Sequence, residues 1–312
     1  MNEVKTYQGA PTKIERCKTP NNPNKLNKNP LTVWKVLIYI FLAIFTALCL
    51  FPLIYEVMLS VSSRDDFLAS KFIVIPRHFN IEMYKLILFQ DAIGRSFVIS
   101  VILTAVGTLY SLIIMSLGAY VLMKKDMPGR RIFFTLILIT MFFGGGLIPT
   151  VLTLRSLHLT NNYLGLILPF GISAFNMILL RNFFAQVPKE VLESCRMDGC
   201  DDFRCLFSFV IPLSKAGLAT IAVFTLVGKW NDWYWPMVLL TNENMYPLAN
   251  QVKIALSASV DNVQAGIIDM TKVFSDGRNG AIIVISLFPI VVVYVALQKY
   301  FVQGVMLGAI KS

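Results

Sequence analysis

Histidine is scarce in this sequence, with His78 and His158 the only two among 312 residues. A catalytic or metal site built on histidine therefore has almost nothing to use. The chain also lacks the GxxxxGK[ST] pattern, whose backbone amides and lysine hold nucleotide phosphates. We expect no catalytic residue and no cofactor on this chain, so energy for any active process has to come from another protein.

Cysteine is also sparse, and its odd count of five predicts no disulfide framework. Three of the cysteines follow one another at equal steps of five residues, a regularity that suggests a metal site. Steps of five do not place side chains on one helical face, however, and no histidine lies nearby. We therefore expect no metal site. The five residues are Cys17, Cys49, Cys195, Cys200 and Cys205.

Charged residues make up only 15% of the chain, against 56% hydrophobic residues. Soluble domains carry about 25% charged residues, so this composition indicates a chain that lies mostly in a lipid bilayer. Several apolar runs reach the roughly 20 residues that a helix needs to cross the membrane. The sequence predicts an all-α, polytopic membrane protein with six transmembrane helices, at about residues 34–62, 96–123, 132–154, 163–180, 213–240 and 280–302.

The net charge of +10 raises the alternative of a nucleic-acid partner. The basic residues gather instead in segments that the six spans place on one side of the membrane. Short cytoplasmic loops are rich in Lys and Arg, so we expect this side to be the cytosol, both termini to lie inside, and no nucleic acid to bind. The predicted outer loop, residues 63–95, weakens the pattern because it also holds basic residues beside acidic ones. The cytosolic set is Lys5, Lys13, Arg16, Lys18, Lys25, Lys28, Lys124, Lys125, Arg130, Arg131, Arg181, Lys189, Arg196, Arg204, Lys215, Lys299 and Lys311.

The first 32 residues form a polar, basic tail rich in Asn, Pro, Lys and Thr, with too little apolar content to pack. We expect residues 1–32 to be disordered in the cytosol and residues 33–312 to form a transmembrane domain in the plasma membrane. The first apolar run follows this tail and exceeds the roughly 7–15 residues of a signal-peptide core, so it is interpreted as a retained span.

A glycine cluster interrupts the third predicted span: Gly144, Gly145 and Gly146, followed by Pro149. Glycine relaxes the restraint on the backbone and proline removes one helical hydrogen bond, so the helix can bend or loosen here. One interpretation is a packing kink, and the other is a hinge for opening and closing. The sequence leaves both open.

Polar residues interrupt the fifth predicted span in the stretch KWNDWYW. Ionisable groups at membrane depth are costly and usually face a cavity or the interior of a bundle. Within one helix, residues 230 and 233 share a face, as do 232 and 235, which predicts aromatic planes and a carboxylate along one passage. Such a wall suits a sugar, whereas the alternative is an interfacial aromatic belt with a structural Lys–Asp pair. The candidate path residues are Lys229, Trp230, Asn231, Asp232, Trp233 and Trp235.

The charged stretch PKEVLESCRMDGCDDF, between the fourth and fifth predicted spans, predicts two short helices joined by a glycine elbow. Pro188 suits the first helical position and Gly199 suits the helix end. Asp201 or Asp202 then caps a second helix that runs toward Pro212. On the cytosolic side such an elbow fits a groove on another protein. The alternative is an amphipathic loop that lies on the membrane surface.

This stretch also resembles the EAA loop of the permeases of binding-protein-dependent ABC transporters, at about residues 187–212. The family pattern is E-A-A, then a glycine, then I-x-L-P. The Glu, the Asp-Gly pair and the last Pro agree, whereas Ser194 and Cys195 replace the alanines and Phe209 and Ile211 replace two apolar residues. The resemblance implies that the ATPase-coupling residues are Glu193, Ser194, Cys195, Asp198, Gly199 and Pro212.

The resemblance extends over nearly the whole chain after the tail, through GGGLIPT, NMILLRNFF, KWNDWYWPMVLL and QKYFVQGVMLGAIK. These segments are similar to the carbohydrate-uptake branch, near the permeases for polysaccharide oligomers and those of lipoprotein gene clusters. The resemblance implies one membrane subunit of a type I importer that takes up a carbohydrate, by preference an oligosaccharide, by alternating access.

The partners implied by the resemblance are a homologous sister permease in a heterodimer, a cytosolic ATPase dimer that holds ATP and Mg, an extracytoplasmic solute-binding protein, membrane lipid and the sugar. The alternative function is a channel or an ion-coupled secondary transporter for a polar solute. Dependence on an ion gradient distinguishes that alternative from an ATP-driven importer.

Overall fold

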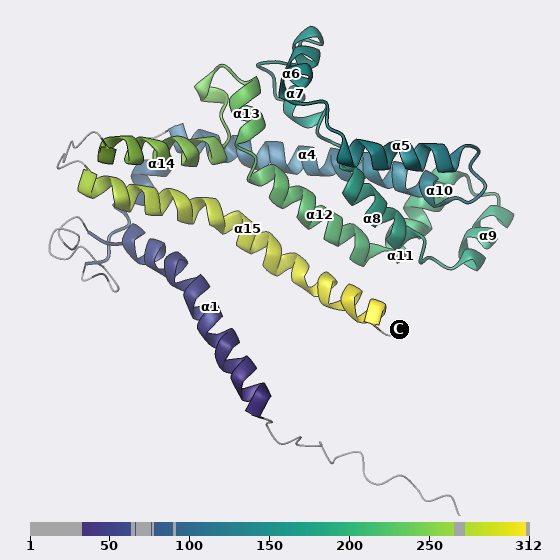
Figure 1. Cartoon of the computed structure of the whole chain (residues 1–312), viewed down its shortest axis with the longest axis horizontal. Helices are drawn as coiled ribbons and strands as arrows, with labels where there is room; N and C mark the ends of the chain where they lie inside the picture. Colours follow the sequence, from purple (N-terminus) through teal and green to yellow (C-terminus); the bar gives the residue numbers. More distant parts are fainter. Residues whose placement is uncertain are drawn as a thin grey trace, which may run out of the picture. The chain divides into compact units, whose positions relative to one another are not determined.

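The computed structural model describes residues 33–63, 66, 76, 78–89, 92–264 and 272–309. Apart from one isolated antiparallel bridge between Ser62 and Phe79, the regular elements in these residues are helices (Figure 1). The all-α expectation is thereby confirmed for the described residues. The predicted tail, residues 1–32, lies outside them.

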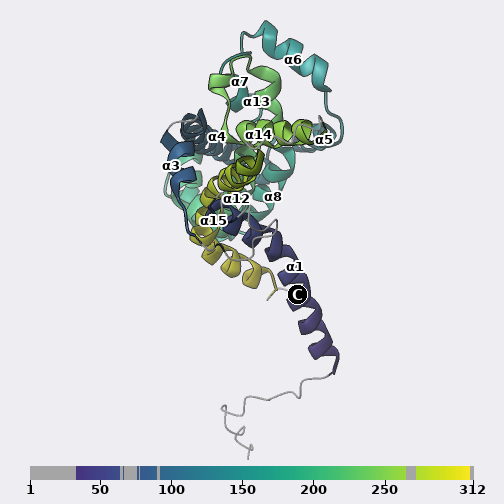
Figure 2. The ribbon, with the colours of Figure 1, turned by 90° about the vertical axis from the view of Figure 1, so that its left-hand side faces the viewer.

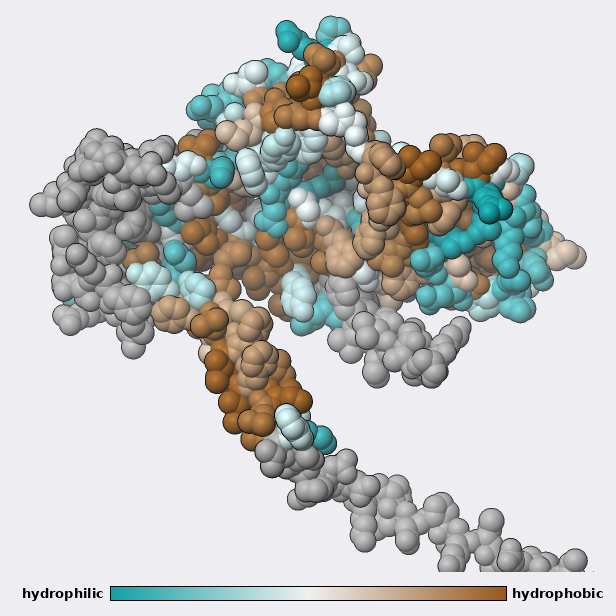
Figure 3. Space-filling model, viewed as in Figure 1, coloured by the Kyte–Doolittle hydropathy of each residue, from teal (hydrophilic) through white to brown (hydrophobic). Residues whose placement is uncertain are grey.

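The first helix, α1 (Val33–Ser60), spans the boundary between two compact units, residues 1–51 and residues 52–312. Its apolar side chains from Trp34 to Phe51 lie on the surface, and Figure 3 shows them as a nearly continuous hydrophobic surface. A helix that is apolar on all sides and leaves this surface uncovered is typical of a membrane span.

In the second unit, the long helix α4 (Ala92–Met123) packs against α8 (Ala174–Phe184) and α12 (Lys215–Trp230). Both ribbon views show these three helices side by side (Figures 1 and 2). Helix α12 also packs on α15 (Lys272–Ala309), and α14 (Leu248–Gln264) packs on α15 and α4. The other elements of the described residues are α3 (Glu82–Phe89), α5 (Arg130–Phe142), α6 (Leu147–Ser156), α7 (Leu164–Ile167), α9 (Lys189–Met197), α10 (Asp202–Cys205), the π-helical turn η1 (Leu206–Val210), α11 (Ile211–Leu213), α13 (Tyr234–Leu239) and the 3-10 turn η2 (Glu243–Met245).

Two clusters of buried apolar side chains hold the second unit together. The first lies where α4, α8 and the segment after α9 meet, and its fully buried members include Met115, Leu180, Phe184 and Leu206. The second joins α3, α4, α12, α14 and α15. Its members are Ile87, Ile93, Trp230, Leu248, Ala281, Ile282 and Ile285. Cys195 of α9 belongs to the first cluster, so α9 packs against the helical core.

Three helices in the described residues are long and apolar enough to cross a membrane: Trp34–Ser60, Ile93–Met123 and Gly277–Ala296. Two bent helix pairs are also long and apolar enough if each pair is one span, which brings the count to as many as five. The fourth predicted span, residues 163–180, is divided into α7 and the first part of α8 by a non-helical segment. The structure thus supports a multi-pass membrane protein with three to five candidate spans.

The third predicted span is not one continuous helix. Helix α5 ends at Phe142, α6 begins at Leu147, and the two axes differ by 113°. Gly146 between them has φ 80°, a left-handed conformation that side chains with a Cβ rarely adopt. Residues 132–154 therefore contain two helices joined by a sharp bend. The break lies at the glycine cluster named above, whereas movement about that cluster stays a prediction.

The fifth predicted span, residues 213–240, is also broken. Helix α12 begins after a bend of 88° at Ser214 and ends at Trp230, and α13 begins at Tyr234. The predicted sharing of helical faces by Trp230 with Trp233 and by Asp232 with Trp235 is wrong, because residues 231–233 leave the helix. The side chain of Asp232 caps the start of α13, since its Oδ1 accepts a hydrogen bond from Trp235 N at 3.2 Å.

Candidate functional site

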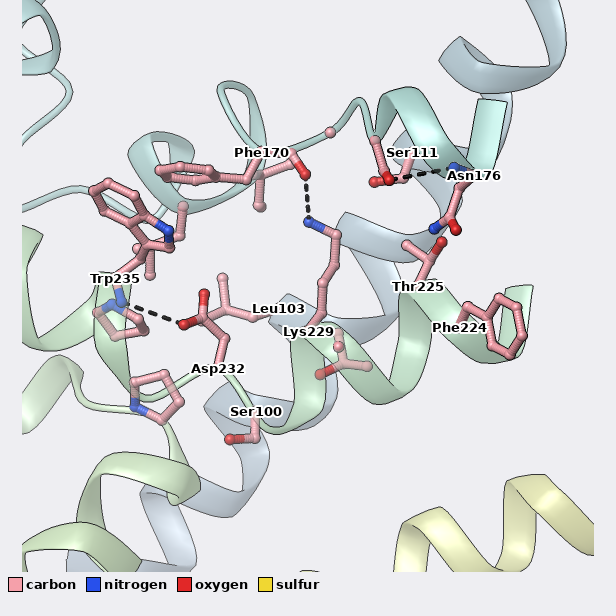
Figure 4. Close-up of a pocket in the computed structure, with 18 of the residues that line it drawn as sticks. Ser100, Leu103, Ser111, Phe170, Asn176, Phe224, Thr225, Lys229, Asp232 and Trp235 are labelled. Carbon is pink, nitrogen blue, oxygen red and sulfur yellow. Dashed lines mark hydrogen bonds between the residues drawn. The ribbon is translucent and has the colours of Figure 1, made fainter. Parts of the chain in front are cut away.

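A polar cavity of about 280 Å³ lies among α4, α12, α13 and the segment that joins α7 to α8 (Figure 4). It contains one lysine, one aspartate, several hydroxyl groups and an amide, set among apolar and aromatic side chains. Concave sites of this composition suit small polar ligands. The lining residues are Ser100, Leu103, Thr104, Ser111, Met115, Leu166, Ile167, Phe170, Gly171, Ser173, Asn176, Phe224, Thr225, Gly228, Lys229, Asp232, Trp235, Pro236 and Pro247.

Lys229 extends from the last turn of α12 into this cavity, as Figure 4 shows. Its Nζ donates a hydrogen bond to the backbone carbonyl of Phe170 at 3.3 Å. Gly107 of α4 leaves the room for its stem, because a Cβ at this position would lie 2.8 Å from Lys229 Cδ. The protein thus engages one of the three ammonium donors through Phe170, and Lys229 lines the cavity.

Asp232 and Trp235 form the opposite wall, beside the first turn of α13. The carboxylate of Asp232 caps that helix, as described above. The ring of Trp235 packs on Phe170, with 4.4 Å between ring centroids and 32° between ring planes. Aromatic faces next to hydrogen-bonding groups fit a sugar, whose C–H faces pack on rings while its hydroxyls take polar partners.

The hydroxyl groups of α4 are functional candidates that the sequence reasoning missed. Ser96, Ser100, Thr104 and Thr108 are buried and follow one another at steps of four, so they lie on one face of the helix. Ser100, Thr104 and Ser111 line the cavity. The step of four was the available signal, but the apolar background of the span concealed it.

Two of the cavity hydroxyls have no hydrogen-bond partner in the described part of the chain, those of Ser111 and Thr225. A buried hydroxyl without a partner costs roughly 1–3 kcal/mol. Water or a polar ligand in the cavity would remove that cost. Ser100 differs, because its Oγ accepts a hydrogen bond from Leu248 N at 2.7 Å and thereby fixes the start of α14.

Three of the six predicted path residues line the cavity, namely Lys229, Asp232 and Trp235. Trp230 lies in the second apolar cluster, and its indole N–H donates to Ser286 O at 3.0 Å. Trp233 is partly exposed beneath Lys253, with 4.9 Å between Nζ and the ring centroid.

Asn231, the remaining predicted path residue, is exposed, and its amide bonds back to Val227 O. The predicted path residues are therefore divided: three line the cavity, Trp230 packs in the second apolar cluster, and Asn231 and Trp233 are exposed.

The charged elbow is a second candidate site, at the end of the unit where Figure 3 shows hydrophilic residues gathered over α9 and α10. Helix α9 begins at Lys189, with Pro188 in the preceding capping position and not at the first helical position as predicted. Gly199 ends the turn with φ 74°. Asp201 Oδ1 then caps α10 by accepting from Arg204 N at 3.1 Å. The two predicted short helices and their glycine elbow are present.

The second arm of the elbow differs from a regular α-helix. It continues from α10 through the π-helical turn η1 and α11, which ends at Leu213. Glu193, Ser194, Asp198 and Pro212 are exposed, whereas Cys195 is buried against the core. Met197, near the tip, is 88% exposed. The elbow thus presents polar residues and one large apolar side chain outward while Cys195 anchors it.

The turn at Gly199 also brings together cysteines that helical spacing alone keeps apart. The Cys195 thiol contacts those of Cys200 and Cys205, and burial together with these contacts raises the pKa of Cys195 to about 12. In the described residues, no group of three or more His, Cys, Asp or Glu side chains is arranged to hold a metal ion.

Polar contacts fasten the elbow to the C-terminal end of α4. Asp202 accepts a hydrogen bond from Tyr120 Oη at 3.2 Å and forms an ion pair with Lys124 Nζ at 2.5 Å. The Lys124 ammonium also lies 4.8 Å from the centroid of the Tyr120 ring. Because α4 also carries the hydroxyl groups of the cavity, one rigid helix links the two candidate sites.

The family described as "Binding-protein-dependent transport system inner membrane component" matches residues 124–307, which include both the elbow and α12. The chain belongs to this family. The permease is 36% identical over 286 residues to the "Polygalacturonan/rhamnogalacturonan transport system permease protein YtcP" of Bacillus subtilis (strain 168), covering 90% of this chain and 99% of that protein. It is 32% identical over 281 residues to "Protein LplC" of the same organism, covering 90% and 95% of the two chains.

A solved structure also resembles the permease. It is described as a bacterial ABC transporter involved in the import of the acidic polysaccharide alginate, with a TM-score of 0.78 and 34% sequence identity. The similarity covers 86% of this chain and 96% of that chain. The resemblance to ABC transporter permeases is thereby confirmed, and the permease is a transport subunit of a membrane system.

Proposed function

We propose that the permease is one membrane subunit of an ATP-driven importer that carries an oligosaccharide through the cavity beside α4. The observation that carries this proposal is the physical link from elbow to cavity through Tyr120, Lys124 and Asp202 at the end of α4. The names of the relatives support a carbohydrate substrate, since YtcP is described as a polygalacturonan and rhamnogalacturonan permease and the solved relative imports alginate.

The ATPase is expected on a separate subunit, because this chain has no phosphate-binding loop. The elbow then docks in a groove of that ATPase, with the exposed Met197 as its apolar contact. Nucleotide-driven closure of the ATPase dimer would move α9, and Asp202 would pass the movement to α4. The cavity on α4 would thereby alternate between the two sides of the membrane.

The assembly and topology follow the same proposal. The permease pairs with a homologous sister subunit, receives sugar from an extracytoplasmic binding protein and contacts membrane lipid. Six crossings, with the N- and C-termini in the cytosol, place the basic elbow on the inner side. The bent pairs α5–α6 and α10–α12 then count as crossings, and α7 with α8 supplies one more.

Lys229 favours an acidic sugar as the transported species. It is the cation of the cavity, and Asp232, the carboxylate of the cavity, is engaged by the backbone amide of Trp235. A uronate carboxylate would take the free ammonium donors of Lys229, while ring hydroxyls would reach Ser111 and Thr225.

The direct test is ATP hydrolysis by the assembled transporter in proteoliposomes, with its binding protein and a set of oligogalacturonates and neutral galacto-oligosaccharides. We expect acidic oligosaccharides to stimulate hydrolysis and to enter the vesicles. Transport without ATP that an ionophore abolishes would establish the channel or secondary transporter instead.

The role of Lys229 is tested in the same vesicles with Lys229→Gln and Lys229→Arg. Loss of one charge-assisted hydrogen bond of about 1.5–3 kcal/mol predicts roughly 10- to 150-fold weaker discrimination in favour of the acidic sugar in Lys229→Gln. Lys229→Arg should retain a preference for the acidic sugar. Equal loss of acidic and neutral transport would show that Lys229 is structural.

A further inference from the structure

A second cavity, of about 310 Å³, lies where the elbow meets the ends of α4, α5 and α8. Basic side chains outnumber acidic ones in its lining, with six cations against Asp126 and Glu193. A concave site with this imbalance attracts anions, because its low-dielectric walls strengthen the field of the cations. The cations are Lys124, Lys125, Arg130, Arg181, Lys189 and Arg196.

Two of these cations are paired with carboxylates, and a third is bonded to a backbone carbonyl. Lys124 pairs with Asp202, Arg196 lies 3.9 Å from Asp126, and Arg130 Nε donates to the carbonyl of Leu122 at 3.0 Å. Throughout the described ranges, no ion pair joins Lys125, Arg181 or Lys189 to a carboxylate. Together with Arg130, whose acceptor is a neutral carbonyl, these three residues give the cavity a net positive charge.

Arg181 has a fixed position deep in the site. Its guanidinium carbon lies 5.8 Å from the centroid of the Phe134 ring on α5, and Nη1 donates to Asn182 Oδ1 at 3.1 Å. Its Nε is buried and has no acceptor in the part of the chain that the structure describes. A planar guanidinium with spare donors, held by a ring and surrounded by lysines, is well suited to phosphate oxygens.

The surroundings of the cavity indicate where the phosphate comes from. The candidate span on α4 ends at Met123 and the bent α5–α6 pair begins at Arg130, so the cavity lies level with the ends of two apolar helices. No residue of α5 is buried, and Ile132 and Phe133 in its first turns are 67% and 51% exposed. An acyl chain can lie along this apolar face while its headgroup enters the cavity.

We propose that this cavity binds the phosphate group of an anionic membrane lipid such as phosphatidylglycerol. The lipid phosphate contacts Arg181, Lys125 and Lys189, and the acyl chains follow α5. Because Lys189, Leu192 and Glu193 of α9 form part of the lining, the bound lipid braces the elbow against α4 and α8. Coupling between the elbow and the core then depends on the anionic lipid content of the membrane.

The test measures lipid retention by the full-length permease with native mass spectrometry, after exchange into dioleoylphosphatidylglycerol or dioleoylphosphatidylcholine. Each basic residue near the membrane surface contributes about 1 kcal/mol to binding of anionic lipid, or roughly a fivefold change in affinity. Lys125→Gln/Lys189→Gln, whose side chains are exposed, should therefore weaken phosphatidylglycerol binding by about 25-fold. The matched control is Arg204→Gln/Lys215→Gln, which removes two exposed cations outside the cavity lining and should change binding little.

A third variant, Arg181→Gln, tests the deep position, and phosphatidylcholine should not be retained by any form. Equal loss of phosphatidylglycerol in the cavity and control variants would contradict the proposal, because it would indicate only general charge attraction. Saturable binding of inorganic phosphate without retention of phosphatidylglycerol would assign the cavity to a soluble anion. Reduced co-purification of the ATPase with unchanged lipid binding would assign it to an acidic surface of that partner.

Discussion

Gly199 gives the sharpest test of the elbow, because the structure separates the conformational effect of a substitution from its steric effect. The residue has φ 74°, and a Cβ added to it would meet no atom within 4 Å. The cost of Gly199→Ala therefore comes from the left-handed backbone alone, at about 1–2 kcal/mol. Asparagine tolerates this conformation better, so Gly199→Asn is the matched control.

The expected result follows from that cost. If only the native elbow docks, Gly199→Ala lowers the affinity for the ATPase by up to about 5- to 30-fold, since 1.4 kcal/mol corresponds to a factor of ten. The assay is the amount of ATPase that co-purifies with equal amounts of inserted permease, followed by uptake in vesicles. Gly199→Asn should lie nearer the wild type. Equal docking and uptake by wild type, alanine and asparagine forms would refute the role of this backbone conformation.

Three further predictions concern the ion pair, the cavity and the buried thiol. Asp202→Asn removes the charge that pairs with Lys124, a pair that contributes about 1 kcal/mol or less to the contact between the elbow and α4, and should uncouple ATP hydrolysis from uptake. Asp201→Asn keeps a good helix cap and should transport normally. Equal uptake by both variants would contradict a coupling role for Asp202. Gly107→Ala should displace Lys229 and reduce uptake, whereas Gly228→Ala, which faces open space in the same cavity, should be tolerated; matching uptake rates would show that the position of Lys229 is immaterial. Burial and the neighbouring thiols raise the pKa of Cys195 to about 12, so at about pH 9 iodoacetamide should label the folded permease much more slowly than the unfolded chain, whose thiol ionises near its ordinary pKa of about 8.5; equal labelling rates of the folded and unfolded forms would contradict the burial. Because the pKa of Cys195 is higher in the folded state than in the unfolded chain, the protonated thiol stabilises the fold below the ordinary pKa. That contribution is lost as the pH rises toward the pKa of the folded state.

The elbow was predictable because its signals are local. Proline before a helix, glycine after it and aspartate as the next cap each act within a few residues, and the structure has helix ends at Pro188, Gly199 and Asp201. The break at Gly146 has the same origin. What these local signals did not give is the bend of 113° between α5 and α6, which no single residue determines.

The sequence was less informative where tertiary contacts decide the outcome. A continuous helix through residues 213–240 was the natural expectation from hydrophobicity, but α12 ends at Trp230, whose indole is buried against α15, and Asp232 caps a new helix, α13. The hydroxyls of α4 did not stand out, because a serine or threonine is unremarkable in an apolar helix. Their significance follows from the packing of α4 against α8 and α12, which encloses the cavity.

The account depends most on the elbow as the contact through which an ATPase moves this membrane subunit. Met197 tests it directly, since its side chain is 88% exposed near the tip of the elbow. A photo-crosslinking amino acid at this position, activated in the assembled transporter, should yield a covalent adduct with the ATPase subunit. Adducts with lipid alone, in a complex that still hydrolyses ATP and transports, would contradict it.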